Sequence, residues 1–165
     1  NGSGTRATAR SHRSLRIPAR RSTGDAVSET LGAALAGEYA AIYAFGRAGG
    51  RLRTGQDIAL AQLSRHRTDR DQLRAWLIAD GQQPEPPAPA YQLPGPVNTD
   101  AQAKALLATV QLRLIPVLVA LLTDQTDEAR RRWAVRAVRR AATSAQGWGA
   151  TGQAFPWPEG LAPPM

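Results

Sequence analysis

A few polar side chains interrupt the apolar stripes of this sequence, and their types could support chemistry inside a fold. Glu38 occupies an inward position of one helical stripe, His66 and Arg70 occupy such positions in the next stripe, and Gln111 occupies one in a third. Residues three or four apart share a helix face, so each of these side chains is expected to point inward with its apolar neighbours. A carboxylate, an imidazole and an amide that meet in a bundle could hold a metal ion or form a hydrogen-bonded cluster.

A di-metal site in a helical bundle needs more carboxylates than these positions supply. Such a site takes one Glu from each of two helices and a Glu-x-x-His pair from each of the other two. Glu38 and His66 match this pattern, but the residue three before His66 is Leu63, and Gln111 stands at the third-helix position. One Glu beside the cation of Arg70 cannot neutralise two divalent ions. We therefore expect no metal and no other cofactor, and instead a buried polar cluster made of Glu38, His66, Arg70 and Gln111. Within it, Glu38 is expected to pair with His66 or Arg70.

Four long helical patterns must position these residues. Apolar residues recur at helical spacing over about 26–48, 54–81, 99–123 and 126–147. Asp25 is expected to cap the first helix, Thr54 with Asp57 forms a capping-box signature at the second, and Thr99 opens the third. No alternating strand pattern occurs in the sequence. The predicted fold class is therefore all-α.

The connections between these helices indicate the topology. The first and second helices are joined by a short Gly-rich turn, and the third and fourth by a few residues near 124–125, so each pair is antiparallel. Between the pairs, Gln82 to Val97 contains six prolines. A Pro-rich stretch extends at ~3.1 Å per residue, so this one reaches ~50 Å, whereas a helix of about 22 residues is ~33 Å long. The prediction is a four-helix bundle of two antiparallel hairpins joined by a long Pro-rich crossover, which is the ferritin-like connectivity.

A family resemblance rests on residue patterns in the same region. They are AALAGEYAAIYAFGRAGG in the first helical pattern, RHRTDRDQL in the second, PAPAYQLPGPV in the connection and RLIPVLVALL in the third. With them, residues 25–150 resemble an actinobacterial ferritin-like domain family of unknown function. The resemblance implies the ferritin-like four-helix fold and no established activity. It also implies that Glu38 and His66 are the remaining counterparts of metal ligands.

The net charge of +8 is concentrated at the N-terminus. Residues 1–23 contain no acid and six arginines, whereas the rest of the chain has 15 basic and 13 acidic residues. The six are Arg6, Arg10, Arg13, Arg16, Arg20 and Arg21. Because this segment has little apolar surface, we expect a flexible basic arm at 1–23, the bundle at 24–149, and a Pro/aromatic tail at 150–165 that packs back over the bundle. The arm is either a solvated tail, linker or leader, or a segment that binds an acidic protein or nucleic acid.

Several classes of chemistry are excluded by composition. The sequence has no cysteine, which excludes disulfides, thiolate metal sites and cysteine nucleophiles. Neither His12 nor His66 lies in an arrangement typical of a catalytic triad, and no phosphate-binding glycine loop follows a strand. We therefore expect a protein that is not an enzyme: a non-catalytic ferritin-like bundle acting as a binding or scaffold module.

Two other functions stay open at the level of sequence. One is a metal-binding ferritin-like oxidoreductase or storage protein with an incomplete di-iron site, and the other is binding of nucleic acid or an acidic protein by the arm. A homodimer through a helix face is a further expectation. Because no apolar run reaches the ~18 residues of a membrane-spanning helix and no signal-peptide core is visible, we expect no membrane partner and a cytoplasmic location.

Overall fold

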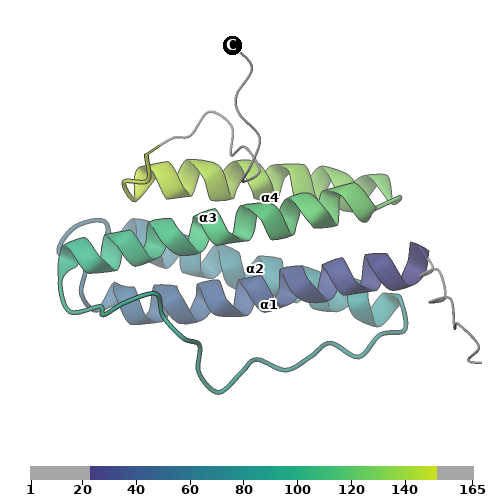
Figure 1. Cartoon of the computed structure of the whole chain (residues 1–165), viewed down its shortest axis with the longest axis horizontal. Helices are drawn as coiled ribbons and strands as arrows, with labels where there is room; N and C mark the ends of the chain where they lie inside the picture. The colour runs from purple at the N-terminus through teal and green to yellow at the C-terminus, as the bar shows by residue number, and fades with distance from the viewer. Residues whose placement is uncertain (1–22, 152–165) are drawn as a thin grey trace, which may run out of the picture.

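Four α-helices make up most of the described chain (Figure 1). The computed structural model describes residues 23–151, with α1 at Thr23–Gly49, α2 at Gln56–Ala79, α3 at Asp100–Asp124 and α4 at Glu128–Gly147. No strand occurs between residues 23 and 151, which confirms the predicted all-α class. The six arm arginines lie outside the described residues, as do Phe155 and Trp157 of the tail, so the predictions about the arm and the tail stay predictions.

The helix starts agree with the sequence at α3 but not at α2. Thr99 caps α3, since its hydroxyl accepts from the backbone N–H of Gln102, and the Gln102 side chain accepts from the backbone N–H of Thr99. The predicted capping box of Thr54 and Asp57 is wrong. Gly55 is the N-cap of α2, with a left-handed φ of 77° and no side-chain cap. The Thr54 hydroxyl instead accepts a hydrogen bond from Lys104 of α3 at 3.1 Å.

The starts of the first and last helices differ from the prediction by a few residues. α1 already begins at Thr23, so Asp25 lies inside its first turn rather than before it. In α4, Asp127 is the N-cap, and its carboxylate accepts from the backbone N–H of Arg130 at 2.8 Å. The carboxylates of Asp25 and Asp127 thus lie at helix N-termini, where negative charge is favourable.

The packing of the helices leaves one side of the bundle open. α1 and α2 run in opposite directions, as do α3 and α4 (Figure 1). α1 packs against both α2 and α3, and α3 packs against α4. Within residues 23–151, the backbones of α2 and α4 do not come into close contact. These two helices are joined by side chains, a feature that shapes the site described below.

The segment between α2 and α3 follows the length of the bundle. Residues 80–99 run from the end where α2 stops to the opposite end, where α3 starts (Figure 1). The ring of Tyr91 lies 5.5 Å from the ring of Tyr43 on α1, and Leu93 and Val97 pack against buried core residues. This segment therefore has fixed contacts with the bundle surface.

The apolar core is divided into two clusters along the bundle axis. The first surrounds Leu35, Leu73, Leu118 and Trp133, and the second surrounds Phe45, Leu52, Leu107 and Trp148. In α2 and α3, the boundary between the clusters falls at His66 and Gln111, which are both buried. A polar layer therefore separates two apolar halves of the core.

α3 differs from the sequence expectation in one respect. By length and composition α3 is apolar enough to cross a membrane, whereas the sequence was expected to contain no apolar segment long enough to span one. Its residues Leu107, Leu114, Leu118 and Leu121 are buried in the core of the bundle. A core helix of a soluble protein meets the same criterion, so this feature is weak evidence for a membrane span.

Candidate functional site

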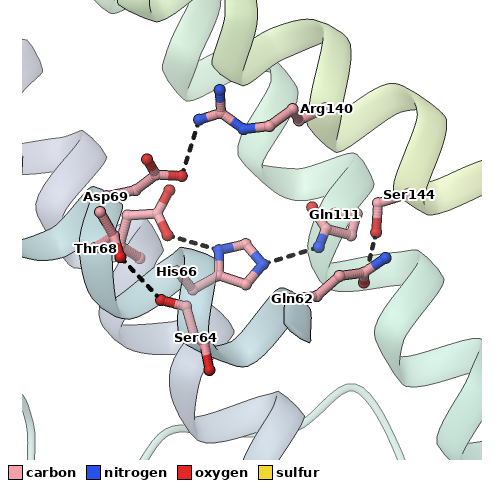
Figure 2. Close-up of polar contacts among 9 residues, drawn as sticks. Gln62, Ser64, His66, Thr68, Asp69, Gln111, Arg140 and Ser144 are labelled. Carbon is pink, nitrogen blue, oxygen red and sulfur yellow. Dashed lines mark hydrogen bonds and ion pairs between the residues drawn. The ribbon is translucent and has the colours of Figure 1, made fainter. Parts of the chain in front are cut away.

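Three helices contribute to a buried polar cluster in the layer between the core halves (Figure 2). His66 Nδ1 lies 2.7 Å from Glu38 Oε2, and His66 Nε2 lies 2.9 Å from Gln111 Nε2. The exposed fractions of Glu38, His66 and Gln111 are 2%, 7% and 2%. The structure thus brings together three of the four side chains that the sequence placed in a cluster.

The directions of these hydrogen bonds agree with one tautomer of His66. Because an amide nitrogen only donates, Gln111 donates to His66 Nε2, which must then carry no proton. The proton of the neutral ring lies on Nδ1, which donates to the carboxylate of Glu38. The ring of Phe45 lies 5.0 Å from the imidazole and is tilted by 47°. Both nitrogens of His66 are therefore occupied by protein groups.

Burial raises the pKa of Glu38 above its ordinary value near 4.5. The hydrogen bond from His66 acts in the opposite direction, as does the positive charge of Arg140, whereas the negative charge of Asp69 raises the pKa further. Desolvation is the largest of these effects, because an ionised carboxylate loses most of its hydration in the core.

A second ion pair, which the sequence analysis missed, lies beside the cluster. Asp69 on α2 is 5% exposed, and its Oδ2 accepts from the guanidinium of Arg140 on α4 at 2.9 Å (Figure 2). One signal could have indicated Asp69, since it lies three residues after His66 and shares its helix face. Arg140 could not be singled out, because α4 carries six arginines around much of its circumference.

Arg70 does not belong to the cluster. Its guanidinium donates to both carboxylate oxygens of its neighbour Asp71, at 2.8 and 3.0 Å, and its side chain is 28% exposed. A long arginine side chain can bury its aliphatic stem while its guanidinium stays in water. The inward position of Arg70 in the helical pattern therefore did not determine where its guanidinium lies. The cation near Glu38 comes from Arg140 instead of Arg70.

Further side-chain bonds link α2 to α4 at each end of the bundle. At one end, Gln62 Oε1 accepts from Ser144 Oγ and from Trp148 Nε1, both at 2.8 Å. At the other end, the guanidinium of Arg130 donates to both carboxylate oxygens of Asp80, at 2.7 and 2.8 Å. Arg130 also lies over the ring of Trp76, with 5.5 Å between the guanidinium carbon and the ring centroid.

Between these helices the structure has a cleft of about 950 Å³. Its floor contains the polar cluster, and its lining also includes Leu114 and Leu118 of α3. Its walls include small residues of α2 and α4 and several arginines, among them Arg65, Arg136, Arg139 and Arg140. The cluster therefore lies at the inner side of the cleft, while its side chains remain buried in the layer between the core halves.

The residues of this layer do not fit a di-metal centre. Within residues 23–151, no group of three or more His, Asp or Glu side chains is arranged to hold a metal ion. The imidazole nitrogens are bonded to Glu38 and Gln111, and Asp69 is neutralised by Arg140. Two divalent cations require several uncommitted carboxylates, which this part of the chain does not offer.

The fold and this site define an all-α, four-helix protein with a buried Glu–His–Gln layer beneath an open cleft. The chain belongs to the family described as Domain of unknown function (DUF4439), whose model matches residues 30–159. The arm at 1–23 lies outside that match.

A solved structure is similar to this chain over most of its length. It is the crystal structure of a conserved hypothetical protein, Rv2844, from Mycobacterium tuberculosis. The two chains are 29% identical with a TM-score of 0.74, and the similarity covers 77% of this chain and 97% of that one. No curated protein matches this chain. The comparisons therefore support the shared fold and an unknown-function family, and they assign no activity.

Proposed function

We propose that this protein is a non-catalytic binding module built on a ferritin-like bundle, in which protein groups occupy the place of the metal site. Two observations support the ferritin-like assignment. Residues 80–99 follow the bundle between two helical hairpins (Figure 1), and Glu38, His66 and Gln111 reach one layer from three helices. In ferritin-like proteins, metal ligands project inward from all four helices at one level.

The observation that carries the proposal is the occupancy of His66. Its Nδ1 bonds Glu38 at 2.7 Å and its Nε2 bonds Gln111 at 2.9 Å, so a metal would have to displace a buried partner. Displacement would leave that partner without a hydrogen bond in the core, which costs about 1–3 kcal/mol per neutral group. The Arg140 guanidinium supplies positive charge where a ferritin-like site has metal ions. The layer thus serves as a structural floor, and the cleft above it is the binding surface.

Metal titration tests the proposal. The purified chain is incubated anaerobically with Fe²⁺, Mn²⁺ or Zn²⁺ and desalted, and bound metal is measured by elemental analysis together with the histidine NMR signals of His66. We expect no stoichiometric metal and no perturbation of those signals. His66→Gln is the matched control, because any background metal bound elsewhere should be unchanged in it. Stoichiometric metal that is lost in His66→Gln would refute the proposal and favour the oxidoreductase or storage alternative.

A further inference from the structure

The cleft between α2 and α4 exists because side chains, not backbones, join these helices. Small residues line it on both sides, namely Ala61 on α2 and Ala137 and Ala141 on α4. The ends of the two helices are held by the bonds of Gln62 to Ser144 and of Arg130 to Asp80. The cleft of about 950 Å³ is lined by Gln62 and Ser144 and extends past them to Ile58 and Trp148, and its volume falls at the upper end of the ~300–1,000 Å³ that ligand pockets span.

The interior surface of this cleft is largely apolar. Leu114 and Leu118 line it from α3, and Trp148 lines it at the end near Gln62. Ile58 of α2 also lines it and is 54% exposed, although an isoleucine gains free energy when it is covered. Leu114, Leu118 and Trp148 are already buried, so the apolar strip that a ligand body would cover consists of the exposed side chains of Ile58 and Ala61 on α2.

The mouth of the cleft is basic on both sides. Arg65 projects from α2, and Arg136 and Arg139 project from α4; all three are exposed. None of the three forms an ion pair with an acidic side chain within residues 23–151, whereas Arg140 is paired with Asp69. Positive charge at the rim of a low-dielectric cleft concentrates anions. Charge complementarity therefore selects an anionic head group.

We infer that the cleft binds an amphiphilic anion, whose head group contacts Arg65, Arg136 and Arg139 while its hydrocarbon body covers the apolar strip. Guanidinium groups bind carboxylate or phosphate by paired hydrogen bonds, so both head groups fit this chemistry. The inference rests on the proposed binding function and specifies the ligand class for the same site.

Binding of defined probes to the full chain tests this inference. Dodecanoate and dodecyl phosphate are the anionic probes, and dodecanol and dodecyltrimethylammonium are the matched neutral and cationic ones, all used as monomers in calorimetric titrations. A bromine-labelled undecanoate reports location, because bromine quenches tryptophan fluorescence only at near contact and Trp148 lines the cleft. We expect saturable binding of an anionic probe, about tenfold or more tighter than the neutral and cationic probes, with quenching that Trp148→Phe removes.

Variants at the rim and in the mouth separate the head-group site from the body site. Arg136→Gln with Arg139→Gln should weaken binding roughly tenfold, or about threefold per partly exposed ion pair. Arg131→Gln, an exposed change on α4 outside the cleft, is the control and should leave affinity within about twofold. Ala61→Trp should fill the mouth and weaken binding at least about tenfold. Ala75→Trp, exposed on α2 outside the cleft, is its control.

Each contrary result has a definite meaning. Equal affinity for the neutral or cationic probe, or no effect of the Arg136 and Arg139 changes, would overturn the anionic head-group site. Normal binding to Ala61→Trp, or binding only to phosphatidylglycerol vesicles and not to monomers, would overturn the cleft as the location. No saturable binding by a metal-free chain would overturn this inference alone, whereas stoichiometric metal on His66 would overturn the proposed function.

Discussion

Removal of the Glu38 carboxylate is the most direct test of the polar layer. In Glu38→Ala, the Nδ1–H of His66 loses its partner at 2.7 Å while the ring stays buried. An unsatisfied buried donor costs about 1–3 kcal/mol, and the lost methylene adds about 0.8 kcal/mol. The raised pKa of Glu38 indicates that burying its carboxylate is itself unfavourable, so removing the carboxylate offsets part of the free energy lost with the hydrogen bond. We expect a loss of about 2–3 kcal/mol in the free energy of unfolding.

Urea denaturation followed by circular dichroism measures this loss, and a double-mutant cycle assigns it. Glu38→Ala and His66→Ala should be non-additive, with a coupling energy of about 1–3 kcal/mol, because the two side chains are in contact. Glu38→Ala and Arg70→Met should be additive within about 0.5 kcal/mol, since Arg70 bonds Asp71 instead. A loss below about 0.5 kcal/mol for Glu38→Ala, or coupling to Arg70 rather than His66, would refute the reasoning.

The raised pKa of Glu38 gives the same carboxyl a pH signature. Above its ordinary value near 4.5, the folded state holds this proton more tightly than the unfolded state, so stability falls as pH rises toward the folded pKa. Glu38→Gln keeps an oxygen that accepts from His66 and has no titrating proton. The stability of Glu38→Gln relative to the natural chain should therefore rise as the pH increases above about 4.5, and should level off once the pH passes the folded-state pKa of Glu38. A pH-independent difference would contradict the raised pKa.

Two further predictions concern helix packing. A Cβ on Gly37 would lie 2.7 Å from the side chain of Leu114, so Gly37→Ala should destabilise the protein by about 1 kcal/mol or more. A Cβ on Gly32 meets nothing within 4 Å, so Gly32→Ala should stabilise the protein by about 0.5–1 kcal/mol. Thermal melts of both variants test this, and equal effects would contradict the close approach of α1 to α3. The Arg130–Asp80 pair should show a coupling energy of about 0.5–1.5 kcal/mol in a double-mutant cycle. Arg130 lowers the pKa of Asp80, so the coupling energy should be fully present at pH values above the ordinary aspartate pKa near 3.8 and should be lost as the pH falls through the folded-state pKa. Coupling that persists in strong acid would contradict this assignment.

The sequence predicted most of the fold because each amphipathic helix has a periodic pattern of apolar residues that can be recognised locally in the sequence. Apolar spacing indicated four helices, and the polar residues that interrupt it indicated Glu38, His66 and Gln111. Such interruptions are informative because a buried polar group needs a partner, and inward positions on neighbouring helices are the nearest source of one. The same logic failed for Arg70, whose flexible side chain reaches the exposed Asp71.

The features that the sequence did not predict depend on distances between helices. Thr54 carries the local pattern of a cap, yet its hydroxyl accepts from Lys104, which is fifty residues away in the chain. Asp69 and Arg140 are separated by seventy-one residues. No periodicity within α4 distinguishes Arg140 from its five neighbouring arginines, because only the position of α2 decides which one meets a carboxylate.

The polar layer and the cleft are two consequences of one arrangement of α2 and α4. A guanidinium that bonds Asp69 from α4 needs several ångströms between the helix backbones, and Gln62 with Ser144 spans the same gap further along. Alanines at 61, 137 and 141 do not fill this space, which leaves the cleft above the layer. In a metal-binding bundle, ligands from all four helices draw the same helices together around the ions. Under the proposed function, the Asp69–Arg140 pair and the Glu38–His66–Gln111 bonds take the place of metal ions and keep the layer satisfied, while the side between α2 and α4 stays open.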